Sequence, residues 1–359
     1  MTDTTGAWIN RQIASLYPGS FALVMATGIV SNAFFNNRYQ ALSDVLFALN
    51  VVAYITLTVL TCRRAFRFRR ELLADLINPH TVFSFFTIVA GTDVLGVSAS
   101  LRGFVVLAVV LWLLAIAIWV VLIYFSFAVL TFLNTAHGAN VVHGGWLIAI
   151  VGTESLVVLG TSIAPFSGGA SISLFVLLHL LWGVGLGLYA IFISLFAYRI
   201  FFFDVEPDDL SPLVWVVMGA AAISTNAGST LILSTPNTPF LLSMRPFIDG
   251  ITLLMWGWAT WWIPLLLVFG FWKHVICKVR FSYTPMFWSL VFPVGMYAVA
   301  SMRLALAADF PPLKLVSGVI VWIAFGAWLL TAFGFVRATW RSYAARNSAA
   351  TNAAPAKDK

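Results

Sequence analysis

The chain has 359 residues, of which 61% are apolar and only 9% are charged. Soluble domains usually carry about 25% charged residues, which solvate their surface. This composition, with a mean hydropathy of +0.96, excludes an ordinary soluble enzyme, a disordered protein and a small secreted module. It indicates an integral membrane protein. The net charge of +7 is then expected to report membrane topology, and no nucleic-acid partner is predicted.

Continuous apolar runs predict ten membrane-spanning helices and an all-α integral membrane protein, because a span needs about 20 apolar residues. The runs do not alternate as the strands of a membrane β-barrel would. The predicted spans are 19–36, 42–62, 79–99, 104–131, 145–164, 171–198, 212–234, 247–271, 285–307 and 313–336. We expect three regions, namely a cytoplasmic N-terminal leader (1–17), a ten-helix transporter domain (18–337) and a disordered cytoplasmic tail (338–359).

The distribution of basic residues predicts the orientation of the chain. An even number of spans puts both termini on one side, and 15 of the 20 Lys and Arg residues fall in the loops and tails of that side. The positive-inside rule therefore predicts cytoplasmic termini in an inner (plasma) membrane. Cys62 and Cys277 each follow or precede basic residues on this side, so we expect free thiols there.

The odd-numbered spans repeat a pattern of an early proline followed by polar residues at mid-depth. Twelve residues separate Pro79 from the pair Thr92–Asp93, and the same number separates Pro212 from Thr225–Asn226. Thirteen residues at 1.5 Å each place these pairs ~20 Å into the membrane. The other polar candidates at this depth are Thr27, Ser31, Thr153 and Glu154. Recurrence once every two spans predicts five copies of a helical hairpin.

Polar groups at mid-depth are costly unless they face the bundle interior or water. We therefore expect the odd spans to line a central path. Even spans, such as the uniformly apolar 104–131, are expected to face lipid. The alternative for each single motif is that its small residues only permit close packing of helices.

Two stretches, PGSFALVMATGIVS (18–31) and FPVGMYAVAS (292–301), resemble the tellurite-resistance/C4-dicarboxylate transporter family. That family is related to the plant slow anion channels and the yeast malate and sulfite transporters, and the resemblance covers about 15–336. It implies five hairpins in a pseudo-five-fold arrangement around a central pore, and a homotrimer of such pores. It also implies a phenylalanine gate, which falls on Phe292 before Pro293. A packing role is the alternative for Phe292.

Asp93 and Glu154 depart from a simple anion path, because an ionised carboxylate repels an anion by about 4 kcal/mol at 4 Å with an effective dielectric constant near 20. Burial favours the neutral form of a carboxyl group. A carboxyl that must be neutral before an anion passes would couple anion movement to protons. The alternative is a pair of structural carboxyls that accept hydrogen bonds from neighbouring helices.

Arg303 lies inside an apolar run near the end of the ninth span. It is a candidate for attracting anions to the mouth of the path. A solvated rim is the alternative, and Asp309, Asp249 or Asp93 could be its ion-pair partner.

These features predict a secondary transporter for small anions, most simply C4-dicarboxylates such as malate, with possible proton coupling. The alternatives are a gated passive anion channel, a sulfite- or tellurite-type oxyanion exporter and, more remotely, a membrane-embedded enzyme or sensor. No nucleotide-binding loop, nucleophile motif or metal-ligand spacing occurs, so neither catalysis nor a cofactor or metal is predicted. The expected partners are the small anion, protons and the lipid bilayer.

Overall fold

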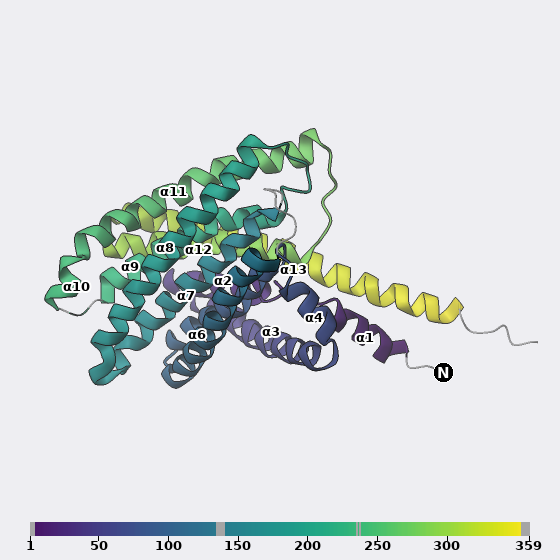
Figure 1. The fold of residues 1–359 in the computed structure, drawn as a ribbon, viewed down its shortest axis with the longest axis horizontal. Coiled ribbons are helices and arrows are strands. Elements are labelled where there is room, and N and C mark those ends of the chain that lie inside the picture. Colours follow the sequence, from purple (N-terminus) through teal and green to yellow (C-terminus); the bar gives the residue numbers. More distant parts are fainter. Residues whose placement is uncertain (1–3, 134–140, 235, 237, 353–359) are drawn as a thin grey trace, which may run out of the picture.

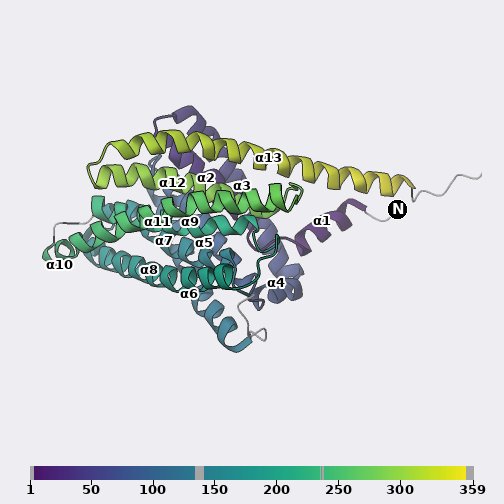
Figure 2. The same cartoon turned by 90° about the horizontal axis from the view of Figure 1, so that it is seen from above.

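The computed structural model describes residues 4–133, 141–234, 236 and 238–352, and in these residues the regular structure is helical throughout. Nine of the described helical segments are long and apolar enough to cross a membrane, and the shorter apolar helix α2 (Ala22–Asn36) makes the tenth. Most helices run along one common direction, as Figures 1 and 2 show. The predicted all-α integral membrane fold with ten membrane helices is confirmed.

Five helices form the inside of the bundle and close into a ring. They are α2, α5 (Phe86–Ser100), α7 (Ile148–Ile163), α9 (Val216–Ser234) and α12 (Trp288–Ala307). Each packs against the next in this order, and α12 packs against α2. Because each of these inner helices comes from one of the predicted odd spans, the five-fold repeat in the sequence becomes a five-membered ring.

Five outer helices follow the inner ones in the chain, and each packs on the inner helix of its own hairpin. They are α3 (Gln40–Arg67), α6 (Val105–Ala128), α8 (Ser171–Phe202), α11 (Arg245–Phe271) and α13 (Pro312–Asn352). The apolar windows of the outer helices are only 11–44% buried, against 67–94% for α5, α7, α9 and α12. Exposed apolar surface of this extent suits contact with lipid, as predicted for the even spans.

Short tight turns precede four inner helices. They are the 3₁₀ segments η1 (Val82–Phe85), η4 (Gly144–Leu147), η7 (Pro212–Trp215) and η9 (Pro285–Phe287). Pro212 and Pro285 are their first residues, where a missing N–H breaks no helical hydrogen bond. Pro18 and Pro79 instead lie in turns a few residues before α2 and η1, so these two prolines mark the approach to a helix and not its first residue.

The remaining elements lie mainly at the ends of the bundle. Figure 1 shows α1 (Thr4–Ala14), α4 (Arg69–Leu76) and the C-terminal part of α13 at one end, called the terminal end below. Helix α10 (Pro239–Ser243) lies at the opposite, distal end. The other short segments are η2 (Val129–Leu133), η5 (Ala164–Phe166), η6 (Gly168–Ala170) and η8 (Trp272–Ile276). Helix α13 continues to Asn352, into the segment where composition predicts a disordered tail.

Small residues let the inner helices approach closely. At Gly219 of α9, an added Cβ would lie 2.7 Å from Cγ of Pro293 on α12. A contact this short cannot be relieved by rotating a flexible side chain, because the proline ring is fixed to its helix. The closed ring therefore depends on glycine at this crossing.

We expect Gly219→Leu to destabilise the protein by about 1–3 kcal/mol, the usual cost of overpacking a core. Thermal stability would be measured on detergent-solubilised protein. The matched control is Gly257→Leu on α11, where an added Cβ meets nothing within 4 Å. Equal stability of the two variants would contradict the tight α9–α12 crossing.

Candidate functional site

A small internal cavity of about 30 Å³, called the central cavity, lies within the ring. All five inner helices contribute to its wall, which is the arrangement expected of a path along the ring axis. The lining residues are Ile29, Asn32, Asn36, Asp93, Val94, Val97, Leu101, Ser155, Val158, Ile223, Asn226, Met296, Val299 and Arg303. This volume holds about one water molecule.

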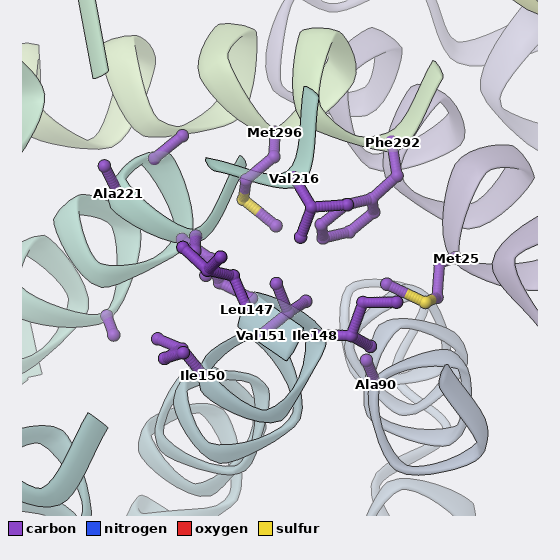
Figure 3. Packing of buried hydrophobic residues seen from close by; sticks show 14 of the residues in the cluster. Met25, Ala90, Leu147, Ile148, Ile150, Val151, Val216, Ala221, Phe292 and Met296 are labelled. Atoms are coloured by element: carbon purple, nitrogen blue, oxygen red, sulfur yellow. The ribbon is translucent and has the colours of Figure 1, made fainter. Parts of the chain in front are cut away.

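Apolar side chains fill the middle of the ring on the terminal side of the central cavity, and we call them the apolar plug. Figure 3 shows Phe292 directed from α12 toward the middle of the ring, among side chains of other inner helices. Phe292 is 1% exposed and belongs to the main hydrophobic core. It precedes the cavity-lining Met296 by about one helical turn. The plug is formed by Phe292 with Met25, Ala90, Val151 and Val216.

Two polar oxygens in the cavity wall lack protein partners among the described residues. The Oδ2 atom of Asp93 accepts a hydrogen bond from Ser155 Oγ at 2.7 Å, but its Oδ1 atom has no partner. The Oδ1 atom of Asn226 is also buried without a partner. Buried polar atoms are normally hydrogen-bonded, so each of these oxygens can accept a hydrogen bond from a water or a ligand in the cavity.

A larger cavity of about 290 Å³, called the distal vestibule, lies at the distal end. Its lining includes Arg38, Arg303 and Lys314, with no acidic residue among the described residues that form it. Arg303 and Asn36 line both this vestibule and the central cavity. The two spaces therefore meet at a side chain that carries a positive charge.

Arg303 has no ion-pair or hydrogen-bond partner in the described part of the chain. Of the partners considered from sequence, Asp249 is bound to Arg245 at 2.9 Å, and neither Asp309 nor Asp93 forms an ion pair with Arg303. By contrast, Arg102 near the same end is held by Asp44 at 2.9 Å and Ser43 at 2.7 Å. Arg102 therefore serves the fold, whereas the Arg303 guanidinium is left available to a ligand.

Four of the hydroxyl residues predicted to line the path are bonded instead to outer helices or to their own backbone. The indole nitrogen of Trp328 donates to Thr27 at 3.0 Å, and that of Trp119 donates to Thr153 at 2.8 Å. Tyr54 and Thr92 share a hydrogen bond of 3.1 Å. Thr225 donates to the carbonyl of Ala221. None of these threonines lines the central cavity.

Ser31 also lies away from the cavity, because its hydroxyl donates to the carbonyl of Ser43 on α3 at 2.7 Å. The residues that line the central cavity are often the sequence neighbours of the predicted ones. Successive residues on a helix are about 100° apart, so when Thr92 faces an outer helix its neighbour Asp93 faces the ring axis. The same rotation brings Asn226 to the cavity and leaves Thr225 outside it.

Glu154 is buried between α7, α8 and α9 and not in the wall of the central cavity. Its Oε1 atom accepts a hydrogen bond from Ser224 on α9 at 3.2 Å, and its Oε2 atom has no partner among the described residues. Gly185 of α8 leaves the space for this carboxyl, since an added Cβ there would collide with it. Glu154 and Asp93 therefore occupy different environments, although the sequence suggests equivalent ones.

Several cavity residues were not selected from the sequence. Asn32 and Ser155 follow directly after the selected Ser31 and Glu154, and shifting each motif by one residue would have found them. Asn32 accepts a hydrogen bond from Ser98 at 2.7 Å. Met296 is apolar and carries no sequence signal for a path, so only its position one turn beyond Phe292 identifies it.

No group of three or more His, Cys, Asp or Glu side chains that could hold a metal ion occurs in the described residues. His80 and His143 stack outside the spans, and His143 accepts from the backbone N–H of Gly145 through Nδ1. Burial lowers the pKa of His143 to about 4, although the hydrogen bond to the His80 backbone acts in the opposite direction. His143 is therefore neutral near pH 7 and caps the start of η4. His137 lies outside the described residues.

A ring of buried helices around an axial cavity, surrounded by helices with exposed apolar surface, is the fold of a multi-pass membrane protein. The family model described as voltage-dependent anion channel matches residues 15–336. The chain therefore belongs to the voltage-dependent anion channel family, whose members are transporters and channels and not enzymes. The resemblance found in the sequence is confirmed, since that match spans the same region.

Curated relatives agree with a membrane transport protein. Two uncharacterized transporters of Methanocaldococcus jannaschii are 27% identical over 330 residues (89% of this chain and 92% of the relative) and 25% identical over 320 residues (87% and 91%). An uncharacterized membrane protein of Mycobacterium tuberculosis is 35% identical over 138 residues, which cover 38% of this chain and 70% of the relative. The descriptions of these relatives do not name a substrate.

Proposed function

We propose that the protein moves small anions across the membrane through the axis of the five-helix ring. The observation that carries this proposal is that two cavities, Arg303 and the apolar plug follow one another along the axis of the ring. The distal vestibule leads to Arg303, then to the central cavity, and the path ends at Phe292. Every inner helix contributes to the cavity wall, so a small shift of these helices is enough to change its width.

The charge distribution supports an anionic substrate. The three cations of the distal vestibule raise the local concentration of anions, and walls of low dielectric constant strengthen their field. Arg303 has no protein partner in the described residues, so it binds an anion without first breaking an ion pair. A C4-dicarboxylate such as malate is the substrate class that the sequence resemblance implies. Its two negative charges suit a vestibule with three cations.

Asp93 supports a proton-linked mechanism. It lines the central cavity with one oxygen unpartnered, so its ionised form would oppose an anion at that point. We infer that Asp93 takes up a proton before the anion passes and releases it afterwards. The location of Glu154 between three helices fits a structural carboxyl, so the coupling role falls to Asp93 alone.

A gated passive anion channel is the second candidate, and the apolar plug favours it. Removing the Phe292 ring would open a continuous path without any need for alternating conformations. The two candidates differ in one measurable respect, because only a proton-linked carrier accumulates its substrate when a proton gradient is applied.

The assembly and orientation are part of the same proposal. We infer a homotrimer with one path in each chain, both termini in the cytoplasm, and a plasma-membrane location. Under this proposal the distal vestibule faces outward. The division into a leader, a transporter domain and a tail stays a prediction.

Phe292→Ala is expected to raise malate flux into liposomes at least tenfold, because it removes the ring that fills the axis. The control is Phe196→Ala, which truncates a buried aromatic residue of α8 that packs on Trp262 outside the ring. Flux is followed with radiolabelled malate. If both variants transport at the wild-type rate, Phe292 is a packing residue.

Arg303→Gln is expected to lower the rate of anion uptake about tenfold at low ionic strength, because electrostatic steering is lost. The difference from wild type should shrink at high salt, where charges are screened. Arg245→Gln serves as the control, since Arg245 is already paired with Asp249 at the same end. Equal losses in both variants would indicate a general surface effect and would count against the Arg303 site.

Asp93→Asn is expected to abolish the stimulation of malate uptake by an inward proton gradient, because asparagine keeps the shape but takes up no proton. Glu154→Gln is expected to keep that stimulation. Uptake would be measured in liposomes with and without the gradient for both variants and wild type. Loss of stimulation only in Glu154→Gln would reverse the assignment, and no stimulation in wild type would favour the passive channel.

A further inference from the structure

A third and larger cavity lies at the terminal end of the bundle, away from the ring axis. It measures about 700 Å³ and is bounded by the end of α11, the segment 277–284 and the turns η7 and η9. A neighbouring cavity of about 360 Å³ continues from it toward α13. The two share Phe281, Ser282, Phe287 and Leu290, so we treat them as one groove, called the α11–α13 groove.

The groove is polar at one part of its wall and apolar over the rest. Lys273 and Arg280 line the larger cavity and outnumber its one described carboxylate, Asp208. Lys273 donates to the carbonyl of Leu210 at 3.1 Å, and Arg280 has no hydrogen-bond or ion-pair partner in the described residues. The continuation is lined by Ala327, Leu330 and aromatic side chains. The groove thus has a charged part followed by an apolar part, which suits a ligand with a charged head and a hydrocarbon chain.

The segment 277–284, which bounds the groove, has a defined conformation. His274 Nδ1 lies 2.9 Å from the carbonyl of Val279, and its ring stacks on Phe281 with 3.9 Å between centroids. Lys278 has a φ of 55°, a left-handed conformation uncommon for a residue with a side chain. In Figure 1 this segment descends along the terminal end, from α11 toward α12. The groove is thus a formed feature of the fold.

We propose that the α11–α13 groove binds an anionic phospholipid, with its phosphate at Arg280 and Lys273 and an acyl chain between α12 and α13. The groove lies at the ends of the apolar segments of α11 and α12, which is the depth expected for a lipid headgroup when these segments span the membrane. Basic residues at this depth attract anionic lipids. The guanidinium also offers paired donors to phosphate oxygens.

A second copy of this chain fits the groove less well. It would have to bring an acidic side chain to Arg280, because the groove is otherwise cationic. The helix α13 contains no Asp or Glu, and the one acidic residue of α11 is Asp249 at the distal end. At this end of the bundle α11 and α13 therefore offer hydrocarbon but no carboxylate.

The test is native mass spectrometry of the full-length protein in detergent, titrated with palmitoyl-oleoyl phosphatidylglycerol or with phosphatidylcholine of the same chains. We expect wild type to prefer phosphatidylglycerol. Arg280→Gln should weaken that binding about fivefold, which corresponds to ~1 kcal/mol for one basic residue at an anionic surface. Arg67→Gln, a change at the end of α3 outside the groove, should leave it unchanged.

A pair of glycine variants tests the hydrocarbon part of the groove. Gly270 lines the larger cavity and an added Cβ there meets nothing within 4 Å, so Gly270→Leu adds bulk at the groove and its Cβ has room. It should reduce binding of phosphatidylglycerol at least fivefold. Gly257→Leu on the same helix is the matched control, since Gly257 is equally open but lies outside the groove.

Three results would overturn the proposal. Equal binding of the two lipids by wild type would remove the role of charge. Competition by millimolar inorganic phosphate that abolishes lipid binding would identify a soluble anion site. Unchanged lipid binding in Gly270→Leu, together with a shift in oligomeric mass, would mean that the groove is an interface between copies.

Discussion

The absence of water in the hydrocarbon core is the constraint on which the rest of this structure depends. Each polar side chain at mid-depth must face inward or bond to a neighbouring helix, because lipid offers no hydrogen bonds. Both arrangements occur in this chain, even at neighbouring residues. Thr92 bonds to an outer helix through Tyr54, while the next residue, Asp93, turns to the ring axis and bonds to Ser155.

The outward arrangement recurs around the ring and ties successive hairpins together. Trp328 of α13 reaches Thr27 of α2, Tyr54 of α3 reaches Thr92 of α5, and Trp119 of α6 reaches Thr153 of α7. In each case the outer helix of one hairpin bonds to the inner helix of the next. The ring is thus fastened by side-chain bonds at mid-depth as well as by glycine contacts such as Gly219 against Pro293.

Some arginines near the distal end stabilise the fold, whereas another belongs to the candidate site. Arg102 and Arg245 are matched to carboxylates and help to hold loops in place. Arg303 has no such partner in the described residues and borders both the distal vestibule and the central cavity. Burying an unpaired charge is costly, so a place for this guanidinium at the junction of two cavities suits a group that meets water or an anion there.

Composition and the spacing of apolar runs alone determined the membrane fold, the ten helices and their pairing into five hairpins, because span length and repeat period are properties of the linear chain. They also located the depth at which polar residues recur. Which neighbour in each polar pair faces the axis was decided only by the tertiary structure, because that depends on how each helix is rotated against its partners. Asp93 and Glu154 occupy similar positions in the sequence repeat, but their surroundings differ in the folded ring. Asp93 lines the central cavity, whereas Glu154 lies between α7, α8 and α9. The pairing of Arg245 and the lack of a partner for Arg303 likewise follow from distances across the fold, which no spacing along the chain records.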